Sequence, residues 1–146
     1  MNLDIAPMTI DDIAEVAAIE RKIFSMPWSE NGFLSSLQSS DTRYLVVREK
    51  GKLIAYCGYL QSLDEADITN VAVDPAFHNR GVGYQMLREL MRLGEKNGVH
   101  RYTLEVRESN VSAIHLYEKL GFAAVGIRKN FYEKPQESAV IMWTEE

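Results

Sequence analysis

Hydrophobic residues recur along this chain with two different periods, and stretches of one period alternate with stretches of the other. Residues 10 to 23 carry apolar side chains at helical spacing, and Thr9 is placed to cap that helix. β-Branched and aromatic residues dominate between residues 44 and 73, as is typical of strands. The same criteria predict strands at 3–6, 44–48, 52–60, 66–73, 100–106, 122–129 and 139–143, and helices at 10–23, from about 29, from after 81 to about 96, and at 111–120.

Turn residues separate these elements. Pro27 interrupts the chain after the first helix, Glu49-Lys50-Gly51 suits a hairpin, and Gly98 and Gly121 suit the ends of two helices. Asn110 is placed to cap the last helix. The alternation predicts a mixed α/β arrangement of layers.

Composition narrows the class of protein. A chain of 146 residues with 46% hydrophobic and 25% charged residues is typical of one globular domain spanning 1–146. No apolar run approaches the roughly 20 residues that cross a bilayer, so we expect no membrane association and a cytoplasmic location. Cys57 is the only cysteine, and its apolar neighbours favour a buried strand residue over a nucleophile.

Charge is unevenly distributed. Residues 1–77 contain 12 Asp and Glu against 6 Lys and Arg, whereas residues 78–134 contain 6 against 10. A basic second half suits a polyanionic ligand, although solvated surface charge produces the same bias. The net charge of −5 and the lack of dense Lys/Arg runs argue against nucleic acid as the main partner.

The segment 70–75, Asn-Val-Ala-Val-Asp-Pro, followed by 78–83, His-Asn-Arg-Gly-Val-Gly, carries the strongest indication of chemistry. It has the pattern of a strand that leads into a glycine-rich turn and a helix. Gly81 and Gly83 allow close approach of a ligand, and the beginning of a helix offers unpaired N–H groups to an anion. An ordinary strand-to-helix turn that needs glycine for its backbone angles is the alternative.

Two other phosphate-binding motifs fit poorly. A dinucleotide fingerprint would need a third glycine where Met86 stands, and a nucleoside triphosphate loop would need Gly-Lys-Ser/Thr where 82–84 read Val-Gly-Tyr. What remains is a short turn suited to a pyrophosphate, followed by a strand that carries one acid, Glu105.

With these residues the sequence resembles the GNAT acetyltransferase superfamily, whose turn reads Gln/Arg-x-x-Gly-x-Gly/Ala. Within it, the segments resemble enzymes that acetylate the N-terminal alanine of a ribosomal protein. His78 and Ser138 depart from the family's usual Gln/Arg and acidic residues. The resemblance covers most of the chain and rests on 19–21, 27–29, 33, 78–83, 104–107, 109–110, 113–114, 116–122, 128–132 and 139–142.

The resemblance implies a mostly antiparallel sheet of about six to seven strands with about four helices, and acetyl-coenzyme A as co-substrate without a metal. It implies Glu105 as general base and Tyr117 as general acid; an ordinary strand carboxylate and a half-buried tyrosine are the alternatives. Trp28 and Tyr132 would wall the acceptor groove, or simply pack. The residues that would bind the cofactor are Val71, Ala72, Val73, His78, Asn79, Arg80, Gly81, Val82, Gly83, Tyr84 and Asn110.

The implied activity is transfer of acetyl to the N-terminal α-amine of a protein, with the N-terminal alanine of small-subunit ribosomal protein eighteen as the implied partner. Two alternatives remain open at this point. One is an acetyltransferase for lysine or a small amine, and the other is a non-catalytic module that binds coenzyme A. The sequence sets no oligomeric state.

Overall fold

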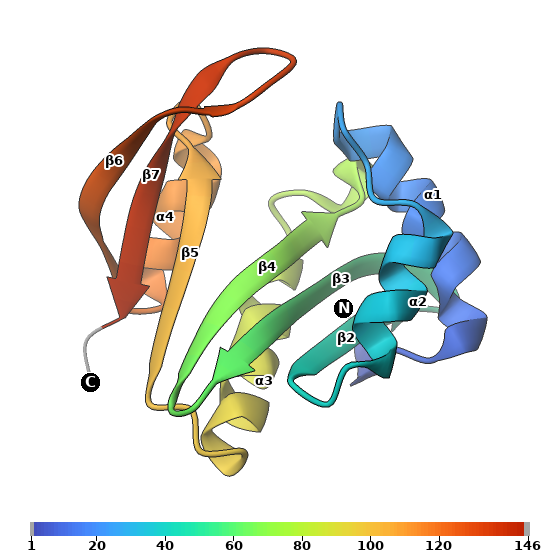
Figure 1. Cartoon of the computed structure of the whole chain (residues 1–146). Helices are drawn as coiled ribbons and strands as arrows, with labels where there is room; N and C mark the ends of the chain where they lie inside the picture. The colour runs from blue at the N-terminus through green and yellow to red at the C-terminus, as the bar shows by residue number, and fades with distance from the viewer. Residues whose placement is uncertain (1, 145–146) are drawn as a thin grey trace.

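A seven-stranded sheet with helices on both faces forms the protein in the computed structural model, which describes residues 2–144 (Figure 1). The strands lie in the order β1-β2-β3-β4-β5-β7-β6. The elements in chain order are β1 (Asp4–Pro7), the 3-10 helix η1 (Ile10–Asp12), α1 (Ile13–Ile23), α2 (Glu30–Gln38), β2 (Thr42–Glu49), β3 (Lys52–Ser62), β4 (Glu65–Val73), the 3-10 helix η2 (Pro75–Phe77), α3 (Val82–Lys96), β5 (Arg101–Arg107), α4 (Val111–Lys119), β6 (Phe122–Tyr132) and β7 (Glu137–Thr144).

The sheet is antiparallel except at one position. Strands β1 to β4 pair antiparallel with their chain neighbours, and β7 pairs antiparallel with both β5 and β6. Only β4 and β5 run parallel. The mixed, mostly antiparallel sheet implied by the sequence is therefore confirmed.

The parallel pair is short. Strand β4 pairs with β5 only at Glu65↔Arg101, Ala66↔Tyr102 and Asp67↔Thr103. Beyond these residues β4 continues beside β3, β5 continues beside β7, and the two strands diverge toward their C-terminal ends (Figure 1). The sheet is thus continuous at one end and open at the other.

A bulge in β4 precedes this opening. Gly58 of β3 faces Asn70 and Tyr59 faces Ile68, so Thr69 is the extra residue on β4. Because side chains alternate between the faces of a strand, one extra residue exchanges the two faces. Accordingly, Ile68 packs in the core beneath α3 and α4, whereas Ala72 packs in the core beneath α1 and α2.

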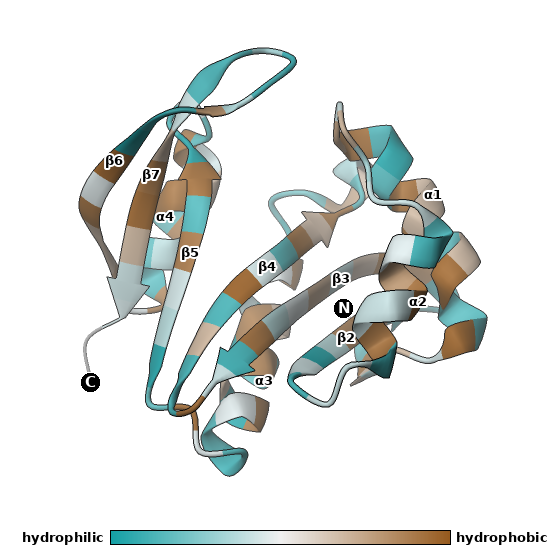
Figure 2. Cartoon of the chain, in the orientation of Figure 1, coloured by the Kyte–Doolittle hydropathy of each residue, from teal (hydrophilic) through white to brown (hydrophobic). Residues whose placement is uncertain are grey.

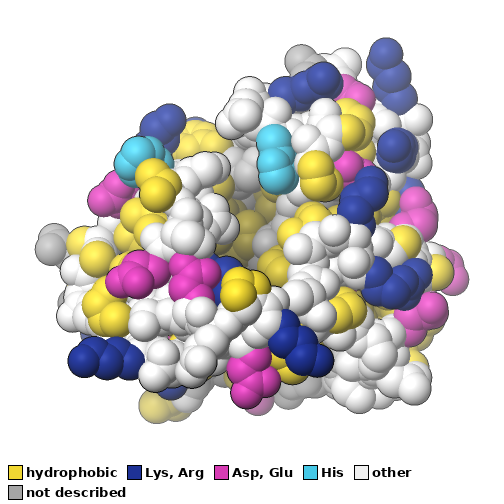
Figure 3. All heavy atoms as spheres, turned by 90° about the horizontal axis from the view of Figure 1, so that it is seen from above, with side chains coloured by type: hydrophobic (Ala, Val, Ile, Leu, Met, Phe, Trp, Pro, Cys, Tyr) yellow, Lys and Arg dark blue, Asp and Glu magenta, His cyan; other side chains and the backbone are white. Residues whose placement is uncertain are grey.

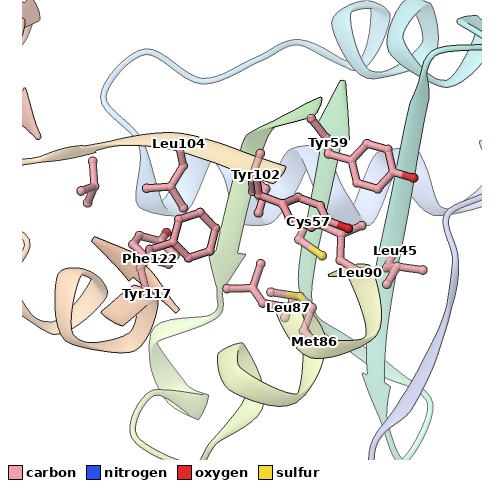
Figure 4. Packing of buried hydrophobic residues seen from close by; sticks show 14 of the residues in the cluster. Leu45, Cys57, Tyr59, Met86, Leu87, Leu90, Tyr102, Leu104, Tyr117 and Phe122 are labelled. Atoms are coloured by element: carbon pink, nitrogen blue, oxygen red, sulfur yellow. The ribbon is translucent and has the colours of Figure 1, made fainter. Parts of the chain in front are cut away.

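Each face of the sheet has its own helices and its own apolar core. Helices α1 and α2 cover one face with side chains such as Val16 and Phe33, and α3 and α4 cover the other (Figure 1). Met86, Leu87 and Leu90 of α3 are fully buried against β2, β3 and β4 (Figure 4). Strand β3 lies between the two cores and is buried throughout residues 53–59, so it is coloured brown or near white over that stretch (Figure 2).

Local signals in the sequence correspond closely to the observed elements. Ser29 caps α2 by accepting a hydrogen bond from the Gly32 N–H at 3.1 Å, and Cys57 is buried in β3, as predicted. One expectation needs correction: the helix predicted from residue 10 begins as the short 3-10 helix η1 before α1 starts at Ile13. Among residues 2–144, no helix has the length and apolar character needed to span a bilayer.

Candidate active site

An open cavity of about 860 Å³ lies at the C-terminal end of β4, between the beginning of α3 and one side of α4. Viewed onto the end where β4 and β5 separate, the surface of the protein is hollowed, with hydrophobic side chains in the hollow (Figure 3). The backbone of Val71 to Val73 forms part of the cavity wall. Because β5 has turned away here, the β5-facing edge of β4 has no strand partner beyond Asp67.

The beginning of α3 is shaped by two glycines with different roles. Gly81 has φ +77°, a left-handed conformation that costs glycine little, and it provides no side chain to cap the helix. Gly83 lies close to α4: an added Cβ would lie 3.1 Å from Leu116 Cδ2, so the leucine side chain would have to move by a few tenths of an ångström. The first N–H groups of α3 have no intrahelical acceptor, so they face the cavity as potential anion ligands.

Most residues predicted to bind the cofactor line this one cavity. They are Val71, Ala72, Val73, His78, Asn79, Gly81, Val82, Gly83, Tyr84 and Asn110. Arg80 does not belong to the lining; its guanidinium lies over the Phe77 ring, 5.4 Å from the centroid. His78 lies in the lining, with its Nε2 2.9 Å from the carbonyl oxygen of Val73.

Asn110 combines two roles that the sequence left as alternatives. Its side-chain oxygen accepts a hydrogen bond from the Ala113 N–H at 3.2 Å, which caps α4, and the residue also lines the cavity. Sequence reasoning missed a further set of lining residues: Phe77, Ser112, Ala113, His115, Leu116 and Lys119. Residues 112, 116 and 119 recur at helical spacing on one side of α4. Only the packing of α4 beside α3 shows that this side faces the cavity.

Tyr117 lies at the inner end of the cavity. Its ring packs edge-on against Phe122 at 5.9 Å between centroids, in the core beneath α4 (Figure 4). Only 7% of the residue is exposed, and burial is the main cause that raises its pKa above the usual value. Within residues 2–144 no group forms a hydrogen bond with its hydroxyl, so this proton donor is available to a ligand.

Glu105 lies on the opposite face of β5 from Tyr117. Leu104 and Val106 point into the core that contains Tyr117, so the intervening Glu105 points to the other side. Its Oε2 lies 3.0 Å from Nε of Arg128 on β6. Asp67 of β4 is also close: burial, and after it the charge of Glu105, raise the pKa of Asp67, whereas Arg128 lowers it.

The gap between β4 and β5 explains how residues on two faces can act together. In a continuous sheet the backbone would separate Glu105 from Tyr117. Here the strands diverge beyond Asp67 and Thr103, so the two faces communicate beside the unpaired edge of β4. A ligand held on the α3–α4 side can therefore meet a second ligand that arrives on the α1–α2 side.

The segment between α1 and α2 forms one wall of the opening between β4 and β5 (Figure 1). Trp28 packs on Phe33 with 5.2 Å between ring centroids and stays 36% exposed. The buried carboxylate of Glu20 accepts a hydrogen bond from the Trp28 N–H at 3.0 Å and another from the Tyr56 hydroxyl. The Glu20 carboxylate of α1 thus holds the backbone of Trp28 in place.

The turn between β6 and β7 forms the opposite wall. Arg107 donates hydrogen bonds to the carbonyl oxygens of Glu133 and Pro135, and its guanidinium lies 4.5 Å from the centroid of the Tyr132 ring. Burial, followed by the negative charge of Glu105, raises the pKa of Tyr132 to about 12. Trp28 and Tyr132 form no contact with each other, and they lie on separate sides of the opening.

Comparisons with known proteins give a consistent result. Residues 13–122 match the model of the acetyltransferase (GNAT) family. The chain is 38% identical over 137 residues to the putative [ribosomal protein bS18]-alanine N-acetyltransferase of Bacillus subtilis, covering 93% of this chain and 91% of that protein. It is 39% identical over 142 residues to the [ribosomal protein bS18]-alanine N-acetyltransferase of Escherichia coli K12, covering 94% of each.

A solved structure agrees with the sequence relatives. The crystal structure of the ribosomal-protein-S18-alanine N-acetyltransferase from Escherichia coli superposes with a TM-score of 0.90 at 36% identity. The superposition covers 98% of this chain and 93% of that one.

Proposed function

Because the chain belongs to the acetyltransferase (GNAT) family, we propose that it transfers acetyl from acetyl-coenzyme A to the N-terminal α-amine of a protein. The proposed acceptor is the N-terminal alanine of ribosomal protein bS18, on which the relatives in Bacillus subtilis and Escherichia coli are named as acting. We infer that the enzyme works in the cytoplasm, where such an acceptor is synthesised.

The observation that carries the proposal is the unpaired edge of β4 beside the cavity. A thioester with a long amide-containing arm needs backbone donors and acceptors along its length, and residues 71–73 offer them where β5 has turned away. The N–H groups at the start of α3 suit a pyrophosphate at the other end of the same ligand. Acetyl-coenzyme A has both parts, so the cavity fits this co-substrate.

The proposed chemistry divides between the two faces of β5. Bound acetyl-coenzyme A would supply an electrophilic thioester. Glu105 would accept a proton from the ammonium of the acceptor through a water molecule, which leaves a neutral amine that can attack. Tyr117, whose raised pKa keeps its hydroxyl protonated, would donate its hydroxyl proton to the sulfur as the C–S bond breaks. The second proton, which the attacking nitrogen loses as the amide forms, would restore the tyrosine hydroxyl. Cys57 is buried in β3, which favours direct transfer without an acetyl-cysteine intermediate.

An α-amine is the acceptor that this arrangement suits best. An unperturbed α-amine has a pKa of about 8 and lysine about 10.4, so the α-amine loses its proton at a cost lower by about 3.3 kcal/mol. A single carboxylate can therefore serve as the base for an α-amine, whose deprotonation costs less free energy than that of lysine.

The test uses a short basic peptide that begins with alanine and contains one internal lysine. The purified protein is incubated with this peptide and acetyl-coenzyme A, and tandem mass spectrometry locates the added acetyl group. A second peptide with a blocked N-terminus reports lysine acetylation alone. We expect acetyl on the α-amine of the first peptide and none on the second.

Variants connect this result to the proposed residues. Glu105→Gln and Tyr117→Phe should both lose most of the product while still binding acetyl-coenzyme A. Acetylation of the blocked peptide would reassign the acceptor to lysine. Binding of acetyl-coenzyme A without acetylation of either peptide would favour a non-catalytic binding module instead.

A further inference from the structure

Arg128 is the cation that lies against the proposed base. Strand β6 places it at the edge of the sheet, from where its side chain crosses β7 and brings Nε to 3.0 Å from Glu105 Oε2. Ala139 of β7 pairs with Arg107 on one side and Arg128 on the other and has no exposed surface. A small residue at this position leaves space for the arginine side chain to cross.

Among residues 2–144, Arg128 is the only cation that lies against the oxygen Oε2 of Glu105. Glu105 Oε2 is shielded from solvent, and no group within residues 2–144 donates a well-aligned hydrogen bond to it. The contact with Arg128 is therefore an ion pair rather than an ordinary hydrogen bond. The Glu105 side chain keeps 24% of its surface exposed, so the rest of the carboxylate can be reached by a water molecule.

The arginine is itself held in place. Its guanidinium lies over the ring of Phe131, 5.3 Å from the centroid, in addition to its contact with Glu105. A planar cation between an aromatic ring and a carboxylate has fewer available orientations than a free surface arginine. The position of the carboxylate is thus fixed from two elements, β5 and β6.

Three other charged or titratable side chains lie near Glu105. Asp67 of β4 is a like charge across the parallel pair, Tyr132 of β6 is close enough for its pKa to respond to Glu105, and Arg107 lies two residues along the same face of β5. The negative charge of Asp67 repels the Glu105 carboxylate, whereas Arg128 attracts it at 3.0 Å.

We propose that Arg128 is a positioning residue for acetyl transfer, which holds the Glu105 carboxylate in one place while leaving its second oxygen free to accept a proton through water. The inference rests on the proposed function, because it takes Glu105 as the base. Arg128 does not touch the reacting atoms; it acts through Glu105 alone.

The first experiment observes the carboxylate directly. Crystal structures of the wild-type protein and of Arg128→Met are compared at Glu105. We expect one Glu105 conformation in the wild-type protein and a displaced or multiply populated side chain in Arg128→Met. Lys129→Met, which removes the neighbouring cation of β6, is the matched control and should leave the conformation of Glu105 unchanged.

The second experiment separates positioning from simple stabilisation. Arg128→Met should lower kcat about tenfold, because the base is no longer held in place. The KM for acetyl-coenzyme A should not change, and Arg128→Lys should recover part of the loss. The rate is measured on whichever amine the wild-type enzyme acetylates, so the test does not depend on the proposed acceptor.

Two results would overturn the proposal. One is an Arg128→Met protein whose Glu105 side chain keeps its wild-type conformation. The other is an Arg128→Met protein with a displaced Glu105 side chain and wild-type kcat. If that variant does not fold, wild-type kcat in Arg128→Gln overturns the proposal instead.

Discussion

The two sides of the opened sheet are built in different ways. The proposed cofactor side draws on two short segments, residues 71–84 and 110–119, which supply backbone groups, glycines and one face of a helix. The proposed acceptor side gathers single side chains from α1, β4, β5, β6 and the turns between them, joined by ion pairs and hydrogen bonds. Glu20, Arg107 and Arg128 each connect elements that are distant in sequence.

This difference has a physical origin. A pyrophosphate and a pantetheine arm are the same in every acetyl-coenzyme A molecule, so a fixed arrangement of main-chain groups can recognise them. An acceptor amine must be oriented, deprotonated and distinguished from other amines, which requires side chains with defined charge. We therefore expect substitutions on the cofactor side to act through space and backbone position, and those on the acceptor side through charge.

The largest expected effect removes the proposed base. Glu105→Gln should lower kcat by about 100-fold or more, because an amide cannot accept the proton. The dissociation constant for acetyl-coenzyme A should stay the same, since Glu105 lies on the other face of β5 from the cavity. Steady-state kinetics and calorimetric titration measure the two quantities. Glu108→Gln is the control, and wild-type kcat in Glu105→Gln would exclude Glu105 from the chemistry.

A second substitution tests whether the buried carboxylate of Glu20 holds the segment that carries Trp28 in place. Glu20→Ala leaves the Trp28 N–H and the Tyr56 hydroxyl without their acceptor, which should lower the free energy of unfolding by about 2 kcal/mol. The KM for the peptide should rise because the segment that carries Trp28 is released. Urea denaturation and peptide kinetics provide the measurements.

The control for that change lies on the same helix. Glu15 forms a largely exposed pair with Arg48, so Glu15→Ala should cost less than about 0.5 kcal/mol. Equal losses of stability in Glu15→Ala and Glu20→Ala would mean that the hydrogen bonds to Glu20 contribute nothing.

A third substitution tests the proposed cofactor side by adding an uncharged side chain where glycine stands. Gly83→Val should weaken acetyl-coenzyme A binding about tenfold, because its Cβ would lie 3.1 Å from Leu116 and displace α4 from the cavity. Calorimetric titration measures the affinity. Gly126→Ala provides the comparison, since the nearest atom to its Cβ, on Ile141, is 4.0 Å away, and acetyl-coenzyme A affinity should be unaffected. Equal affinities in both variants would contradict the close contact of α3 with α4.

The smallest expected effect concerns the acid stability of the segment that leads into α3. The hydrogen bond from the Ala76 N–H, with help from Lys22, lowers the pKa of the buried Asp74 carboxyl. A group with a lowered pKa in the folded state contributes its full stability above its unfolded pKa of about 3.9 and loses it as the pH falls through the folded value. Asp74→Asn should therefore show a shallower loss of stability below about pH 4, measured by urea denaturation across that range. A slope identical to that of wild type would contradict the assignment.

The two sides of the opened sheet also differ in how much of them could be predicted from the sequence. Residues 71–84 are recognisable because their information is local: a strand, two glycines and the beginning of a helix follow one another directly. The helices and strands themselves were also predictable, with boundaries shifted by a few residues, because their signals are periodic. Tyr117 was singled out by the family resemblance, and the structure places it in the cavity wall.

Features that depend on pairing between distant segments could not be predicted in this way. Nothing near residue 128 indicates that its side chain reaches Glu105, since this contact requires β7 to lie between β5 and β6. The extra residue at Thr69 and the divergence of β4 from β5 likewise depend on register, which periodicity does not encode. Glu20 looked like one more charged residue on a helix, and only the fold shows that it is buried.

The short parallel pair also sets the mechanical behaviour of the protein. Three residue pairs connect the half-sheet β1–β4 to the half-sheet β5–β7–β6, whereas β2 and β3 share eight. The pairs at 65–67 and 101–103 are thus the least extensive connection in the sheet, and the core beneath α3 and α4 also joins the two half-sheets. A rotation of one half-sheet against the other about these pairs would change the width of the opening most at the end farthest from them.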